Sequence, residues 1–291
     1  MKFKGLIIFI LIIAAFGAGV YFKNDAIRFY DNLNAGINSF QKTDIGKLVA
    51  EVQKELLTPP PLNAGGAESN VVLLKSRIIA ETNLQRLQNA NLPALKENAK
   101  LSQAAMAKAN DMFKNQYFEH TSPSGVDPGR LVQNYGYDYI LAGENLILGN
   151  FSSEKEVVQD WMNSPGHRAN ILNNRYTEIG VSIIKGTYKG ETVWIGVQEF
   201  GLPVSSCPAP DNALKNKIDA DKILLDQLSL DIDQKKAEIE NTNRRSAQYN
   251  ILVDEYNQLV GQYNPLANET KSLISQYNQE INDFNNCVSV K

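Results

Sequence analysis

The sequence predicts an α+β protein in which a sandwich of helices and a sheet is followed by an antiparallel helical hairpin. Amphipathic helical patterns precede two strand patterns joined by a turn, and this order favours a largely antiparallel sheet over a doubly wound one. The residues from 204 to 291 instead carry a heptad repeat of apolar side chains, which is typical of a coiled coil. An unbroken apolar run also lies near the N-terminus.

That apolar run extends from Gly5 to Phe22, with Lys2 and Lys4 before it and Lys23 after it. Its length is near the lower limit for a membrane-spanning helix, ~17–25 residues. A cleavable signal peptide is the alternative, because Gly17-Ala18-Gly19 is a segment of small residues. We favour a retained membrane anchor over residues 1–23, because the run is longer than the usual signal core of ~7–15 residues. Both interpretations place the rest of the chain outside the cytoplasm.

Residues 24–73 are expected to form a stalk and linker. Apolar residues from Ile45 to Leu56 repeat at helical spacing. The run Thr58-Pro59-Pro60-Pro61 should end that short helix, because proline lacks the amide hydrogen and clashes with the preceding turn. Residues Asn63–Ala67 are interpreted as a flexible linker.

The globular domain is expected over residues 74–203. Helices are predicted near 74–88, 96–114 and 127–134. A fourth helix should follow Ser152 or Ser153, because Glu156 stands three residues after Ser153, as in a capping box. Strands are predicted at Ile179–Ile184 and Thr192–Val197, with a turn at Lys185–Gly190 between them.

Residues 204–291 are expected to form an antiparallel coiled-coil hairpin. Its first arm carries a heptad in which Asp221 and Lys235 fill two core positions, and its second arm contains Pro265, which should kink the helix. The turn should fall near Asn241–Ser246, where the apolar repeat lapses. The predicted core consists of Leu214, Ile218, Leu225, Leu228, Ile232 and Ile239 on one arm, and Tyr249, Val253, Tyr256, Val260, Tyr263, Ala267, Thr270, Ile274, Tyr277, Ile281 and Phe284 on the other.

The two cysteines, Cys207 and Cys287, lie at matching distances from this turn. They lack the Cys-x-x-Cys spacing of zinc or redox sites, and an oxidising compartment would let them pair. We therefore predict a disulfide across the base of the hairpin. The net charge of −3 and the absence of a basic stripe argue against a nucleic-acid partner.

The chain contains only two histidines, His120 and His167, and both stand in segments rich in Ser, Pro and Gly that are interpreted as loops. Glu144 lies between them, within Gly143-Glu144-Asn145. Two imidazoles and a carboxylate can hold zinc or another divalent cation, or act as general acid and base. The His-Glu-x-x-His pattern of metalloproteases is absent. The residues alone therefore leave metal binding, acid–base chemistry and unrelated polar loops open.

Residues from about 74 to 203 resemble the CAP superfamily of cysteine-rich secretory proteins, antigen 5 and pathogenesis-related 1, and its bacterial branch in particular. Individually these motifs are modest, but their order and spacing together are specific. They are Thr82-Asn83-x-x-Arg86, Leu95-x-x-Asn98-x-x-Leu101, Ala107-x-Ala109-x-Asp111-Met112, Tyr117-Phe118-x-His120-x-Ser122-Pro123-x-Gly125, Gly143-Glu144-Asn145, Trp161-Met162-x-Ser164-Pro165-Gly166-His167-Arg168-x-Asn170-Ile171-Leu172, Ile179-Gly180-Val181 and Gln198-x-Phe200-Gly201.

The resemblance implies an α-β-α sandwich with an open cleft, surrounded by two histidines and two acidic residues. Three of the four map here, to His120, Glu144 and His167. The fourth acid follows the Trp-bearing helix in many members, whereas Trp161-Met162-Asn163-Ser164 contains no carboxylate. This departure should weaken binding of a divalent cation, although Ser164 or Asn163 could supply a neutral oxygen. Gln198 lines the cleft or sits on a strand face.

The family has been linked to metal binding, to sterol or lipid binding and occasionally to proteolysis. We therefore expect a membrane-anchored, extracytoplasmic protein whose cleft binds a divalent metal, a small amphiphile or a cell-envelope ligand. One alternative is a metal-assisted hydrolase of peptides or envelope polymers, with His120, Glu144 and His167 as candidate catalytic residues. Another is an adaptor that binds a protein partner through the hairpin.

Overall fold

The computed structural model describes residues 52–67 and 70–289, so the predicted anchor at residues 1–23 lies outside the described residues. None of the helices in the described part of the chain is long and apolar enough to span a bilayer. These residues divide into two compact units. One holds residues 52–67, 70–209 and 284–289, and the other holds residues 210–283.

The first unit is built on a mixed sheet. Three long strands, β4 (Tyr139–Gly149), β6 (Glu191–Pro203) and β5 (Glu178–Tyr188), pair in that order and antiparallel. Three short strands pair parallel to them at the edges: β1 (Glu55–Leu57) and β2 (Leu62–Gly65) on β4, and β3 (Lys96–Glu97) on β5. The predicted largely antiparallel sheet is thus confirmed in its three long strands.

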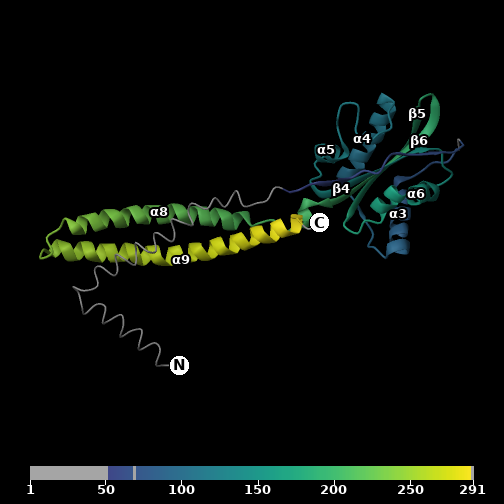
Figure 1. The fold of residues 1–291 in the computed structure, drawn as a ribbon. Helices are drawn as coiled ribbons and strands as arrows, with labels where there is room; N and C mark the ends of the chain where they lie inside the picture. Colours follow the sequence, from purple (N-terminus) through teal and green to yellow (C-terminus); the bar gives the residue numbers. More distant parts are fainter. Residues whose placement is uncertain (1–51, 68–69, 290–291) are drawn as a thin grey trace, which may run out of the picture. The chain divides into compact units, whose positions relative to one another are not determined.

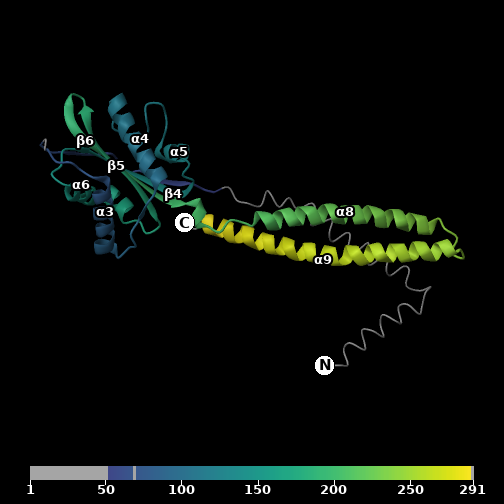
Figure 2. The same ribbon diagram turned by 180° about the vertical axis from the view of Figure 1, so that it is seen from behind.

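Helices cover both faces of this sheet (Figures 1 and 2). Helices α4 (Ala99–Asn115) and α5 (Pro128–Asn134) lie on one side. Helices α3 (Lys75–Ala90), α6 (Glu154–Asn163) and α7 (Pro165–Ile171) pack on the other. Ser153 caps α6, as the capping box predicts, and Asp127 caps α5. The expected α-β-α sandwich is confirmed.

Each face of the sheet has its own core, because side chains alternate along a strand. On β4, Leu146 and Leu148 pack with α4, whereas Ile147 packs with Trp161 of α6. Helix α4 approaches β5 closely at Gly180, where an added Cβ would lie 2.1 Å from the main-chain carbon of Leu101. Glycine at position 180 therefore allows the helix to pack closely against the strand.

Residues Glu55–Gly65, which we call the strap, depart from the prediction. The helix expected to end at Leu56 is wrong over residues 52–57, of which 55–57 form β1, and its residues before 52 lie outside the described part. The expected flexible linker is wrong at residues 63–65, which belong to β2. The physical reason is that main-chain groups of the strap pair with the free edge of β4, while Leu57 and Leu62 pack against the core. Helical spacing in the sequence carries no information about that edge.

Two further predictions are wrong in detail. His167 lies on the helix α7, not in a loop, because Pro165 occupies the first turn of a helix rather than ending one. The turn between β5 and β6 is shorter than predicted: the strands extend to Tyr188 and Glu191. Lys189 and Gly190 between them both have positive φ, which suits a tight hairpin turn.

The second unit contains most of two long helices, α8 (Asn212–Glu240) and α9 (Ala247–Ser289), which run side by side in both ribbon views (Figures 1 and 2). The turn between them spans residues 241–246, as predicted, and α9 continues through Pro265. All six predicted core residues of α8 are buried, and they pack against α9 from Leu252 to Ile281. The hairpin is confirmed, whereas its supercoiling stays a prediction.

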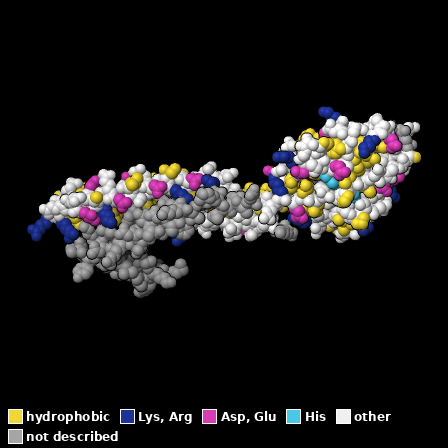
Figure 3. All heavy atoms as spheres, turned by 45° about the horizontal axis from the view of Figure 1, so that its top comes forward, with side chains coloured by type: hydrophobic (Ala, Val, Ile, Leu, Met, Phe, Trp, Pro, Cys, Tyr) yellow, Lys and Arg dark blue, Asp and Glu magenta, His cyan; other side chains and the backbone are white. Residues whose placement is uncertain are grey.

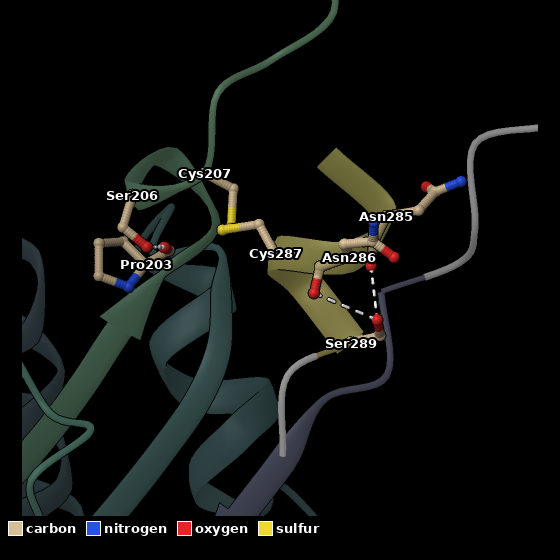
Figure 4. Close-up of a disulfide and its surroundings, with 7 residues drawn as sticks. All are labelled: Pro203, Ser206, Cys207, Asn285, Asn286, Cys287 and Ser289. Atoms are coloured by element: carbon tan, nitrogen blue, oxygen red, sulfur yellow. Dashed lines mark hydrogen bonds between the residues drawn. A yellow bond between two sulfur atoms is a disulfide. The ribbon is translucent and has the colours of Figure 1, made fainter. Parts of the chain in front are cut away.

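The predicted disulfide joins Cys207 and Cys287, whose Cα atoms are 5.8 Å apart and 80 residues apart in sequence (Figure 4). Cys207 follows a short 3-10 turn, η2 (Val204–Ser206), and Cys287 lies in the last turns of α9. Both belong to the first unit, where Cys207, Phe284 and Val288 pack with Ile140 of β4. The bond therefore fastens the end of α9 beside the last strand.

Candidate functional site

The candidate site is centred on Glu144 of β4 and His120 of the loop between α4 and α5. Glu144 is fully buried and, by strand alternation, faces α4 with Leu146. Its Oε1 lies 2.6 Å from His120 Nδ1. The side chain of His120 retains 13% exposure. The strand thus holds the carboxylate inside the domain, while the loop brings an imidazole to it from the surface side.

The other ring nitrogen of His120 binds the strap. Nε2 lies 2.5 Å from the carbonyl oxygen of Pro59. A carbonyl can only accept a hydrogen bond, so Nε2 carries a hydrogen, and a second hydrogen is shared between Nδ1 and Glu144. Pro59 also lies against α7, where a Cβ added to Gly166 would be 2.7 Å from the Cβ of Pro59. Pro59 of the strap therefore lies directly against His120 and α7, where the family resemblance places the cleft.

A second carboxylate, which the sequence analysis missed, lies beside Glu144. Glu199 of β6 pairs with Glu144 in the strand register and is almost completely buried. Burial, followed by the neighbouring Glu144 carboxylate, raises the pKa of Glu199 well above its ordinary value, and Lys108 opposes the shift. If both groups were ionised, Glu144 Oε2 and both oxygens of Glu199 would lack a donor. A proton held by Glu199 supplies one.

Lys108 of α4 is the buried cation of this site, at 3% exposure. Its Nζ donates to the carbonyl oxygen of His120 and lies 5.0 Å from the ring centre of Tyr117. Burial lowers the pKa of Lys108, whereas Glu144 and Glu199 raise it. The nearby carboxyl groups thus offset part of the cost of burying this cation in a low dielectric.

His167 approaches the same stretch of β4 from the opposite face of the sheet. Its Nδ1 lies 2.8 Å from Ser164 Oγ, and its carbonyl accepts from Asn145 Nδ2 at 3.2 Å. Burial first, and then the charge of nearby His120, lower the pKa of His167 to about 4, against a smaller opposing effect of the Leu146 backbone. At neutral pH His167 is therefore an uncharged imidazole.

An amide network fixes this second histidine. Asn145 also donates to Gln198 Oε1 at 3.1 Å and accepts from Asn170 Nδ2 at 3.0 Å. Gln198 in turn donates to Thr82 Oγ1 of α3 at 2.8 Å. All four side chains are buried. Gln198 thus faces the α3 side of the sheet, away from the Glu144 carboxylate, and its hydrogen bonds join β4 and β6 to α3.

The predicted metal ligands do not form a ready metal site. No group of three His, Cys, Asp or Glu side chains in the described residues is arranged to hold an ion. His120 uses one ring nitrogen on Glu144 and the other on Pro59. Ser164 Oγ bonds to His167 and Asn163 Oδ1 accepts from Gln159, so both neutral oxygens already have hydrogen-bond partners. Histidine atoms reach the surface at two neighbouring spots on one face of this domain (Figure 3).

The domain thus combines a mixed sheet, covered by helices on both faces, with a histidine–carboxylate pair at β4. Residues 77–200 match the model of the cysteine-rich secretory protein family, CAP. This part of the chain is a CAP domain of the bacterial type, and the resemblance drawn from the motifs is confirmed.

Two bacterial proteins are similar to part of this chain. The uncharacterized protein YkwD of Bacillus subtilis is 40% identical over 119 residues, which cover 41% of this chain and 46% of YkwD. The uncharacterized membrane protein YlbC of the same organism is 30% identical over 135 residues, which cover 46% of this chain and 38% of YlbC. The chain thus spans less than half the length of these curated relatives.

Among solved structures, an extracellular SCP-domain protein of Bacillus anthracis is 33% identical, with 43% of this chain and 39% of that one covered and a TM-score of 0.38.

Proposed function

We propose that this protein is an extracytoplasmic binding module whose His120–Glu144 pair holds a carbonyl oxygen of a cell-envelope ligand. One observation carries the proposal: His120 donates through Nε2 to the Pro59 carbonyl, while Nδ1 is anchored on Glu144. An acidic partner that orients one ring nitrogen makes the other a directed, charge-assisted donor. Envelope peptides, with a carbonyl at each residue, suit such a donor.

Two observations support the extracytoplasmic location. The Cys207–Cys287 disulfide suits an oxidising compartment. The apolar run Gly5–Phe22 is the proposed membrane anchor, and it lies outside the described residues. Binding of a small amphiphile at the same site and binding of a divalent metal stay predictions. A hydrolytic role for His120, Glu144 and His167 stays a hypothesis as well.

The test is a titration of the full chain with disaccharide–peptide fragments of peptidoglycan. Binding should shift the ring-nitrogen NMR signals of His120, which are easily assigned because the chain has two histidines. His120→Ala should weaken binding about tenfold or more, since a hydrogen bond to a charged group contributes ~1.5–3 kcal/mol. Asn110→Ala, at an exposed position of α4, is the matched control. Equal affinity of the wild type and His120→Ala would reject the proposal.

A second candidate function is protein binding by the hairpin. Four large aliphatic side chains on its surface are exposed, although its core is well packed: Ile223, Leu224, Leu230 and Ile251. Ile223 and Leu230 stand seven residues apart on α8 and so share one side of the helix. The double variant Ile223→Ser, Leu230→Ser should lose co-purifying partners from envelope extracts but keep its helical circular dichroism. Recovery of the same partners by wild type and variant would exclude this role.

A further inference from the structure

The strap is bound to the candidate site as a peptide ligand would be. We propose that residues 55–65 occupy, within the same molecule, a binding site for an extended, proline-containing peptide of a partner protein, which replaces the strap when it binds. This inference rests on the proposed function, because the His120–Glu144 pair belongs to both. It adds the chemical class of the ligand and the segment that competes with it.

The main chain of the strap follows the edge of β4. Glu55–Leu57 pair in parallel with Leu141–Gly143, and Leu62–Gly65 pair with Ile147–Gly149. Residues 58–61 join these two short strands without pairing, opposite Glu144–Leu146 of β4. This pattern is β-strand addition with a proline-rich bulge in its middle. Proline suits the bulge because it has no main-chain hydrogen to leave unpaired.

Three groups of the domain contact the strap at that bulge or at the residue before it. His120 Nε2 donates to the Pro59 carbonyl. Asn170 Nδ2 donates to the Leu57 carbonyl at 3.2 Å. Gly166 leaves room for the Pro59 ring, which any side chain at position 166 would meet at 2.7 Å. Two of these contacts are hydrogen bonds to main-chain carbonyl oxygens, and the third is space for a proline ring. The site therefore fits a class of peptides rather than one sequence.

The strap buries little apolar surface. Its two paired segments contain three and four residues, its apolar anchors, Leu56, Leu57 and Leu62, are only partly buried, and its ion pair from Glu55 to Arg175, at 2.7 Å, is partly exposed. The sandwich beneath it has its own cores on both faces, formed by residues of the sheet and helices. Segments with few buried apolar contacts open at a small fraction of the global unfolding free energy. A partner peptide can therefore compete for the edge without unfolding the domain.

The experiment uses the full chain and a fluorescent peptide with the sequence of residues 55–65. The double variant Leu57→Ser, Leu62→Ser weakens the strap without altering His120, Glu144 or Asn170. Its control is Leu84→Ser, Leu87→Ser, since both leucines are exposed on α3. The weakened variant should bind the peptide at least tenfold more tightly than the wild type or the control, because a larger fraction of its sites is vacant. Changing Pro60 of the peptide should weaken its binding less than changing Pro59, because Pro59 contacts His120 and Gly166.

Each outcome has a distinct meaning. Equal peptide affinity of the weakened variant and the wild type would overturn the inference. If the peptide binds but adding His120→Ala to the weakened variant changes nothing, strand addition stands and carbonyl recognition by His120 fails. If muropeptides shift the His120 signals but the peptide does not bind, the proposed function stands and this inference fails. Amide exchange of the unmodified chain is a check independent of mutation: the β1 and β2 amides should exchange much faster than those of β6, and equal protection would also overturn it.

Discussion

Glu199 is a buried carboxyl group whose pKa is raised well above its ordinary value, by burial first and then by Glu144. Its raised pKa means that the folded protein holds a proton that the unfolded chain releases. Stability from this group is therefore complete below the ordinary glutamate pKa and is lost as the pH rises through the folded pKa.

Replacing Glu199 by Gln should remove this pH dependence. Between the ordinary glutamate pKa and the raised pKa of Glu199, the wild type should lose up to about 1.4 kcal/mol of unfolding free energy for each unit of rising pH. The Glu199→Gln variant should not show this loss, because its side chain is a neutral amide at every pH. Urea unfolding between pH 4 and 8, followed by fluorescence of Trp161 and Trp194, measures the slope. Glu191→Gln, at an exposed position of the same strand, should leave the slope unchanged, and an equal effect of both variants would refute a buried proton at Glu199.

His167 should produce the opposite slope at lower pH. Its pKa is lowered to about 4, mainly by burial. Between pH 6.5 and 4 the unfolded chain therefore binds a proton at His167, whereas the folded protein does not. Stability from this group is present above pH 6.5 and falls as the pH drops toward 4, by about 3 kcal/mol at most. Ring-nitrogen NMR should find His167 uncharged at pH 6, and His167→Gln should flatten the slope of unfolding free energy below pH 6.5. A ring already charged at pH 6 would contradict the burial argument.

At the scale of elements, the helices with a regular apolar repeat could be predicted from the sequence, whereas the pairing of strands within the sheet could not. The spacing of apolar residues locates α3, α4 and both arms of the hairpin, because each of these helices buries one stripe. Strand β4 has no such stripe, since all eleven of its residues are buried, Glu144 and Asn145 among them. Glu199, at the unspecified position of the Gln198-x-Phe200-Gly201 motif, was not predicted as a site residue, because its position beside Glu144 depends on strand register. The strap was missed for the same reason.

The contact of α4 with β5 can be tested with one methyl group. Gly180→Ala would place its Cβ 2.1 Å from Leu101 C and 2.2 Å from Ser102 N, and main-chain atoms of a helix cannot give way locally. We expect a loss of at least about 2 kcal/mol, in the range for overpacked cores. Gly261→Ala is the matched change in α9, where an added Cβ meets nothing within 4 Å, and it should stabilise the helix by about 0.5–1 kcal/mol.

Tryptophan fluorescence separates these two effects, because both tryptophans lie in the CAP domain and are buried. Gly180→Ala should shift the fluorescence transition to lower temperature, whereas Gly261→Ala should shift the helical dichroism signal to higher temperature. A Gly180→Ala variant as stable as the wild type would mean that the helix and the strand can separate without cost.

At the scale of the whole molecule, one covalent bond closes the hairpin. The Cys207–Cys287 disulfide bridges 80 residues, so in the unfolded chain it removes the freedom of a long loop. The chain-entropy model gives a contribution of about 4 kcal/mol for a loop of that length. Cys207→Ala, Cys287→Ala should therefore unfold at a clearly lower urea concentration than the oxidised wild type, as measured by helical dichroism. Reductant should bring the wild type to the same midpoint and leave the double variant unchanged; a reductant effect on the variant, or none on the wild type, would rule out this bond as the cause.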